Sequence, residues 1–155
     1  DIAVVDGPAD MESARVTPGE EAVVAQAAGA LLGLTICYDL RFPELYRRLA
    51  QAGAEVLAVP AAFTKVTGEA HWHVLNRARA IENGCYVVAP CQYGTLPGGA
   101  ACFGHSLIVD PWGTVLAEVG EGEGVATAWI DPAVVARVRA SLPSLRHRVL
   151  GAERA

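Results

Sequence analysis

Residues 34–44 read Leu34-Thr35-Ile36-Cys37-Tyr38-Asp39-Leu40-Arg41-Phe42-Pro43-Glu44. This segment predicts an apolar strand that ends at Ile36, a cysteine directly after it, and a helix that begins at Phe42. In open α/β sheets, ligands bind beyond the carboxyl ends of the strands. The order of strand, cysteine and helix therefore predicts that Cys37 projects from that edge of a sheet.

The turn around Cys37 has residues that suit a nucleophile. The backbone N–H of Tyr38 would face a group attached to the sulfur and form part of an oxyanion hole. The nearby helix N-terminus and Arg41 favour the thiolate, which is the reactive form of cysteine. The alternative, from the residues alone, is that Cys37 is a core cysteine, because free cysteine is among the most buried residue types.

Strands and helices alternate on both sides of this turn, and a group of short strands follows. The predicted strands are 21–26, 31–36, 56–60, 86–89, 106–109, 115–118 and 125–130, and the predicted helices are 42–52, 69–84 and 133–141. The first two strands flank Ala28-Gly29 as a hairpin, the last three form an antiparallel meander, and residues 94–101 form a Gly/Pro loop. Asp131 and Pro132 are a suitable N-cap and first residue for the last helix. We predict one α/β domain over residues 1–155, with a mixed sheet and helices on one face.

The composition limits the classes of partner. Charged residues make up only 19% of the chain, against about 25% in an average globular domain, which suggests extra buried area in a larger fold or at a subunit interface. The net charge is −5 and the basic residues are scattered, so nucleic acid is excluded as a partner. No apolar run is long enough for a transmembrane helix and the chain begins without a signal peptide, so no membrane partner is expected.

The remaining cysteines and histidines suggest structural roles. Four cysteines without a C-x-x-C motif make disulfides or a zinc ribbon unexpected and favour the cytoplasm, with Cys85, Cys91 and Cys102 in or near the core. Positions i and i+2 of a helix face apart, so His71 and His73 cannot share a metal ion, and no metal site is predicted. His105 is interpreted as a hydrogen-bonded residue at the start of a strand. The cluster Arg77, Arg79 and Glu82 is interpreted as a structural ion-pair network.

Four segments carry a resemblance to a known family. They are Ile-Cys-Tyr-Asp-Leu-Arg-Phe-Pro-Glu at 36–44, Phe-Thr-Lys-Val-Thr-Gly-Glu-Ala-His-Trp at 63–72, residues 77–87, and residues 104–113 from Gly-His-Ser to Asp-Pro-Trp-Gly. Together they resemble the nitrilase superfamily, the carbon–nitrogen hydrolases, and most of all its deaminated glutathione amidase and ω-amidase branch. The resemblance runs from residue 1 to about residue 148.

The resemblance implies an αββα sandwich with a Glu–Lys–Cys triad and no cofactor. Cys37 would attack an amide carbon, ammonia would leave, and water would hydrolyse the thioester. Glu12 matches a second glutamate that supports the site; without the family it would be an ordinary exposed carboxylate. The base glutamate and the lysine of the family lie before the position where this chain begins, and Lys65, the only lysine, belongs to another motif. We therefore expect the carboxyl-terminal half of the sandwich, with negligible turnover alone.

The resemblance also implies a substrate class and partners. Arg41 would clamp a carboxylate, with a salt bridge to Asp39 or Glu44 as the structural alternative. Phe63 and Thr67 match residues that line the acyl pocket, although Phe63 alone would be interpreted as core. Substrates in this branch are small ω-amides of 2-oxo dicarboxylic acids, free or within a deaminated tripeptide, and the family commonly forms homodimers. The uncharged loop Gly94–Cys102 departs from relatives that carry basic residues there, which puts recognition of an extended acid in doubt.

Two functions of other classes remain open at this point. The chain could be a catalytically incomplete half-fold that acts as an assembly or binding subunit and buries its apolar surface against a partner. An acyltransferase that uses the same thioester is the other alternative.

Overall fold

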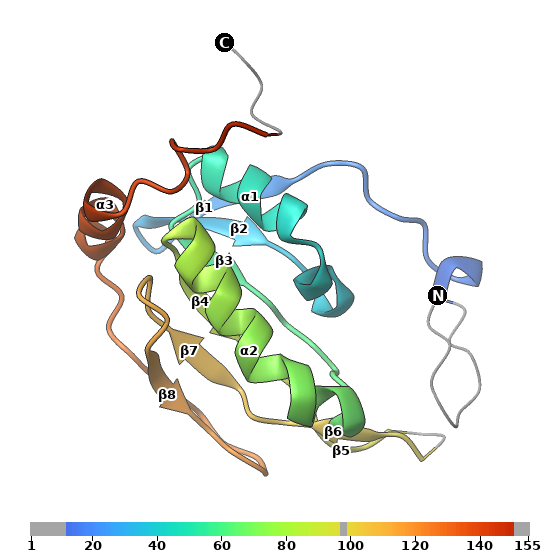
Figure 1. The fold of residues 1–155 in the computed structure, drawn as a ribbon. Helices are drawn as coiled ribbons and strands as arrows, with labels where there is room; N and C mark the ends of the chain where they lie inside the picture. Colours follow the sequence, from blue (N-terminus) through green and yellow to red (C-terminus); the bar gives the residue numbers. More distant parts are fainter. Residues whose placement is uncertain (1–11, 97–98, 151–155) are drawn as a thin grey trace.

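The computed structural model describes residues 12–96 and 99–150. Its main sheet has six strands in the order β1-β2-β3-β4-β7-β8 (Figure 1). These are β1 (Val23–Ala27), β2 (Ala30–Leu34), β3 (Val56–Ala58), β4 (Tyr86–Ala89), β7 (Leu107–Val109) and β8 (Val115–Glu118). The helices are α1 (Pro43–Gln51), α2 (Lys65–Asn83) and α3 (Pro132–Ser141).

The sheet is mixed, as the sequence predicts. Strand β1 pairs antiparallel with β2, the central strands β2, β3 and β4 are parallel, and β7 and β8 continue antiparallel. Leu34 of β2 pairs with Ala58 of β3, which pairs with Val88 of β4, so the three parallel strands end at one edge of the sheet. Cys37 follows β2 at that edge. The predicted hairpin is confirmed, and its turn has positive φ at Ala28 and Gly29, as a two-residue type I′ turn requires.

Both faces of the sheet carry apolar side chains, because neighbouring residues of a strand point to opposite faces. Leu57 of β3 and Val87 of β4 belong to the main core with residues of α1 and α2, which lie over the same face in Figure 1. Val56 and Tyr86 point the other way and pack with Val135 of α3. The prediction of helices on one face is therefore right for α1 and α2 and wrong for α3.

Three local predictions were wrong. Residues 125–130 form no strand: Val125 and Trp129 are 88% and 98% exposed, and the chain turns away from the sheet after β8 at Gly120 and Gly122, both with positive φ. The loop predicted at 94–101 is the end of a second hairpin, in which β5 (Tyr93–Thr95) pairs with β6 (Ala101–Phe103).

The third difference concerns the start of α2, which begins at Lys65 rather than at residue 69. Gly68, which precedes the predicted helix, lies inside the first turn of α2. A Cβ at this position would lie 2.4 Å from Cγ of Phe103, so the glycine serves close packing between α2 and β6.

Two further observations concern the helices. The cap of α3 is as predicted, with Asp131 Oδ1 accepting a hydrogen bond of 2.9 Å from the backbone N–H of Ala133. Within residues 12–96 and 99–150, no helix combines the length and the apolar character that crossing a bilayer requires.

Candidate active site

Cys37 occupies a strained position directly beyond β2. It begins the short 3-10 helix η2 (Cys37–Arg41) with φ of +46°, a left-handed conformation that costs a non-glycine residue about 1–3 kcal/mol. Its backbone N–H donates a 2.8 Å hydrogen bond to the carbonyl of Pro60, beyond β3. Strain of this kind concentrates at functional sites, and here the surrounding hydrogen bonds hold it in place.

Buried hydrogen bonds tie this turn to the sheet and to α1. The Thr35 hydroxyl lies 2.8 Å from the hydroxyl of Tyr46 and donates a 2.8 Å bond to the carbonyl of Ala58. Burial raises the pKa of Tyr46 well above its ordinary value, although the hydrogen bond with Thr35 lowers it. Tyr46 therefore stays a neutral phenol, and the end of β2 is fixed two residues before the cysteine.

Cys37 differs from the other three thiols in its exposure. It is half-buried beside the main core, whereas Cys85, Cys91 and Cys102 are buried, as predicted, and all four are free. Burial is the largest cause that raises the pKa of each of those three thiols, to about 11 at Cys85. Cys37 is thus the cysteine with access to solvent.

The backbone N–H of Tyr38 is available for an oxyanion. It donates no hydrogen bond to another residue in the described part of the chain. The turn is closed instead by Asp39, whose Oδ2 accepts a 2.8 Å bond from the backbone N–H of Ile36. The Asp39 carboxylate is therefore engaged with the backbone of its own turn.

Arg41 lies between aromatic rings. Its guanidinium carbon is 5.4 Å from the centre of the Tyr38 ring and 5.2 Å from that of Phe63, and Nη1 is 3.3 Å from Nδ1 of His71. Arg41 forms no ion pair with any acidic residue among those described. The structural alternative, a salt bridge from Arg41 to Asp39 or Glu44, is therefore not found there. A half-buried guanidinium of this kind can receive a carboxylate through two parallel hydrogen bonds.

Phe63 contacts this arginine, and Thr67 lies on the helix that carries its other neighbour, His71. Phe63 is 4% exposed and packs against Trp72 with ring centres 5.1 Å apart, so it belongs to the core and also faces Arg41. Thr67 lies in the first turn of α2, on the same helix face as His71, and its hydroxyl is 2.7 Å from that of Thr64.

The structure does not join Glu12 to the cysteine. Glu12 is exposed in the short helix η1 (Glu12–Ala14) and makes no hydrogen bond or ion pair with residues 34–44. Lys65 is also exposed, and its ammonium group forms a 3.1 Å ion pair with Glu121, which raises the pKa of the lysine. The geometry thus gives Lys65 a surface role, in line with the sequence analysis.

Residues that the sequence analysis treated as structural, or did not single out, support the turn. Buried Arg79 donates two hydrogen bonds, of 3.0 and 2.7 Å, to the carbonyl of Leu40, and a third of 2.9 Å to Glu82. The predicted ion pair of Arg79 and Glu82 is confirmed, whereas Arg77 bonds to the carbonyl of Gly113. The link between His71 and Arg41 joins positions 30 apart in sequence, and no local pattern reveals it.

A separate group of potential ligands lies on another face of α2. His71 and His73 point to different neighbours, as their spacing predicts, because His71 contacts Arg41 and His73 contacts Glu118. His73, His105 and Glu118 form the one group of metal-ligating side chains found within the described residues.

Comparisons with known proteins all identify the same family. Residues 2–140 match the model of the carbon-nitrogen hydrolase family. A deaminated glutathione amidase from Synechocystis sp. is 52% identical over 151 residues, which cover 96% of this chain and 56% of that protein. The chain therefore spans about half the length of this curated relative.

Solved structures show the same fold. The NitFhit protein of C. elegans superposes with a TM-score of 0.88 at 43% identity, covering 96% of this chain and 36% of that one. An amidase variant from Nesterenkonia sp., with a TM-score of 0.75 and 31% identity over 90% of this chain and 49% of that one, carries an acetamide moiety on its active-site cysteine. The sequence and the fold agree, and this chain belongs to the carbon–nitrogen hydrolase family.

Proposed function

We propose that the protein hydrolyses a small carboxylate-bearing amide through a thioester on Cys37 and releases ammonia. The observation that carries this proposal is the position of Cys37, which is half-exposed at the edge where the parallel strands end and held at positive φ. The similarity to a deaminated glutathione amidase supports an amide as the class of substrate.

The proposed reaction has two stages. The Cys37 thiolate attacks the amide carbon, a C–S bond forms, and the negative charge on the carbonyl oxygen is stabilised by the N–H of Tyr38. The C–N bond then breaks and the nitrogen leaves as ammonia after gaining a proton. Water attacks the resulting thioester, the C–S bond breaks, and the acid product and the thiol are released.

Recognition of the substrate is assigned to the groups around Arg41. The guanidinium would bind the carboxylate of the substrate, while Phe63 and Thr67 would line the acyl part of the pocket. A 2-oxo dicarboxylic acid ω-amide fits this arrangement because it has a carboxylate at one end and an amide at the other. The absence of charge in the loop 94–102 favours a short substrate over an extended one.

The proposal needs groups besides those described around Cys37. Glu12 is assigned the supporting carboxylate. A base glutamate and a lysine are needed as well, and Lys65, the only lysine of residues 1–155, is not assigned that role because it pairs with Glu121. General acid–base help contributes typically about 10²–10⁴-fold to a rate. Cys37 without that help would therefore give negligible turnover.

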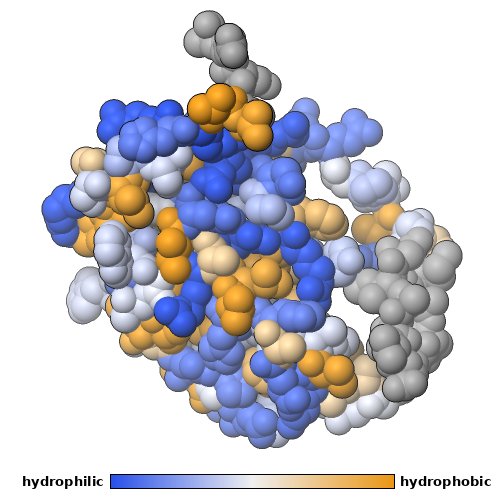
Figure 2. Space-filling view, in the orientation of Figure 1, coloured by the Kyte–Doolittle hydropathy of each residue, from blue (hydrophilic) through white to orange (hydrophobic). Residues whose placement is uncertain are grey.

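An assembly role is the second candidate, and exposed apolar side chains favour it. On α2, Val66 and Val74 are 79% and 66% exposed, and Figure 2 shows apolar patches (orange) between polar side chains on the face that carries α2. Trp129, before α3, is 98% exposed. These surfaces suit a subunit that forms a homodimer, and they are compatible with activity as well as with a purely structural role. The cytoplasm is proposed as its location on the cysteine pattern alone.

Two measurements test the proposed chemistry. Iodoacetamide at neutral pH should alkylate Cys37 faster than Cys102, as measured by mass spectrometry of peptides, and equal rates would contradict a reactive site.

The intact protein should release ammonia from 2-oxoglutaramate, and Cys37→Ser should abolish this release. Transfer of the acyl group to an added amine without hydrolysis would instead identify an acyltransferase. Selective labelling with no reaction on any amide would leave the assembly role as the function.

A further inference from the structure

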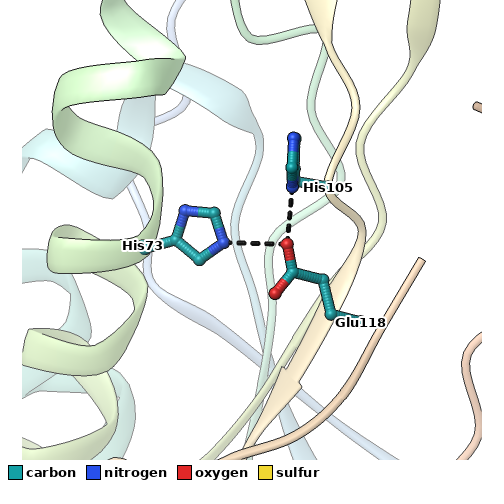
Figure 3. A group of neighbouring side chains, drawn as sticks. All are labelled: His73, His105 and Glu118. Atoms are coloured by element: carbon teal, nitrogen blue, oxygen red, sulfur yellow. Dashed lines mark hydrogen bonds and ion pairs between the residues drawn. The ribbon is translucent and has the colours of Figure 1, made fainter. Parts of the chain in front are cut away.

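Three side chains from separate parts of the chain converge beside β8 (Figure 3). Oε1 of Glu118 lies 3.0 Å from Nε2 of His73 and 2.5 Å from Nδ1 of His105. Each side chain offers one ligand atom, and these atoms all lie within 4.8 Å of one another. His73 comes from α2, His105 from the connection between β6 and β7, and Glu118 from the end of β8.

The backbone and the core hold His105 in place. Its N–H donates a 2.9 Å bond to the carbonyl of Gly120, and its own carbonyl accepts a 2.8 Å bond from the indole of buried Trp72. Its ring stacks on Phe103 with centres 4.2 Å apart. The backbone at His105 has φ of +55°, so these contacts fix a conformation that is uncommon for residues other than glycine.

The other two groups are on regular elements. Glu118 pairs with Leu107 across β7 and β8, and His73 lies on the long helix α2, its ring edge-on to Phe103 with centres 6.0 Å apart. Sites built on helices and strands hold their ligands more exactly than sites on loops. The cluster is therefore positioned before any ligand arrives.

The donor set and its spacing suit a transition metal. Zinc binds nitrogen and oxygen ligands at about 2.0–2.2 Å in a tetrahedron, which puts neighbouring ligand atoms roughly 3.3 Å apart. The two contacts to Glu118, at 2.5 and 3.0 Å, would open to admit such an ion, and the two nitrogens already lie within 4.8 Å of each other. Imidazole nitrogens favour zinc, copper, iron and nickel over calcium and magnesium.

The cluster is also accessible. The side chains of His73, His105 and Glu118 are 35%, 21% and 31% exposed, so an ion can enter and water can occupy a fourth position. None of the three forms a hydrogen bond, ion pair or ring contact with residues 34–44. Occupancy is therefore separable from the chemistry at Cys37.

We propose that His73, His105 and Glu118 form a binding site for a divalent first-row transition metal of the zinc type. The ion would replace the hydrogen bonds to Glu118 and cross-link α2 to β8 and to the connection before β7. Each neutral imidazole would present its lone pair to the metal, with its proton moved to the other ring nitrogen; an imidazolium would release a proton. The sequence-based expectation of no metal considered only His71 and His73, and the proposal differs from it.

Cobalt(II) is the probe that tests the site, because its visible absorption reports ligand type and geometry. The intact protein, with the accessible thiol of Cys37 first alkylated, should bind one Co²⁺ per chain with the spectrum of nitrogen and oxygen ligands, and Zn²⁺ should displace it. The test variants are His73→Ala and Glu118→Gln, and the matched control is His71→Ala on the same helix. Circular dichroism establishes that each variant is folded.

Loss of a direct ligand should weaken binding at least as much as loss of an outer-shell partner, which typically costs about 10–100-fold. We expect that loss in both test variants and an unchanged affinity in His71→Ala. The proposal is overturned if the wild-type protein binds no Co²⁺ at submillimolar concentrations, if His73→Ala binds equally well, or if His71→Ala loses binding to the same extent. Should Glu118→Gln unfold, the affinity of His73→Ala decides the question.

Discussion

Nη1 of Arg41 lies 3.3 Å from Nδ1 of His71, so a residue four positions after the cysteine is held by a residue of α2. Arginine is always a donor, and the neutral imidazole therefore accepts this bond at Nδ1 and carries its proton on Nε2. The contact orients the guanidinium between the Tyr38 and Phe63 rings. Substitution of Arg41 therefore tests what this oriented guanidinium binds.

Replacement of Arg41 should impair recognition of the substrate carboxylate. Hydrogen bonds to charged groups contribute about 1.5–3 kcal/mol, which corresponds to roughly a 10–150-fold loss in kcat/KM for Arg41→Ala. Arg41→Lys should recover little, because an ammonium group cannot form two parallel bonds. Initial rates with a carboxylate-bearing amide and with its uncharged analogue measure the effect. The exposed Arg48→Ala on α1 is the control, and an equal loss on the uncharged analogue would contradict the assignment.

The backbone strain at Cys37 should lower the free energy of unfolding of any variant with a side chain at this position. At φ of +46°, a side chain costs about 1–2 kcal/mol that glycine avoids, against an entropic cost of glycine of about 0.5–1 kcal/mol. We expect Cys37→Gly to be more stable than Cys37→Ala, by up to about 1.5 kcal/mol, although both lack the thiol. Urea unfolding of the two variants measures the difference. A less stable glycine variant would show that the turn is unstrained.

The buried hydroxyl pair behind the turn should be energetically coupled. Thr35→Val leaves the buried Tyr46 hydroxyl without its partner, at a cost of about 1–3 kcal/mol. Tyr46→Phe should cost less, because the Thr35 hydroxyl keeps the Ala58 carbonyl as an acceptor. The double variant should therefore lose less than the sum of the two single losses. Denaturant unfolding of all three variants measures the coupling free energy between the two hydroxyls, with exposed Thr127→Val as the control. Strictly additive losses would show that the two hydroxyls are not coupled.

Cys85 should make stability fall at alkaline pH. Burial raises the pKa of its thiol from 9.0 to about 11, while the nearby Arg139 lowers it. A raised pKa means that the thiol favours the folded state below pH 9, and that this contribution is lost as the pH rises toward 11. The wild-type protein should therefore lose more stability than Cys85→Ala over this range. Urea midpoints of both proteins at several pH values measure this difference. An equal fall of the two midpoints with pH would contradict the effect of burial on the thiol.

Local patterns in the sequence were sufficient for much of the fold. The apolar strand before Cys37, the hairpin at Ala28-Gly29 and the cap at Asp131 all depend on neighbours within a few residues, and each is present in the structure. The segment 125–130 has the same apolar alternation but no strand partner in the structure, because pairing depends on where the chain goes after β8. Alternation specifies a face that can be buried, and a strand also needs a neighbour.

The sequence by itself determined the turn at Cys37 and the family of the chain, because the residues that specify them are adjacent or occur in ordered motifs. Only the tertiary structure decided that His71 orients Arg41 and that His73, His105 and Glu118 meet, since these contacts join residues 13 to 45 positions apart. A helix or strand sets the direction of each side chain locally. Which side chains then face one another depends on how α2 packs against the sheet. The spacing of residues in the sequence does not predict these contacts.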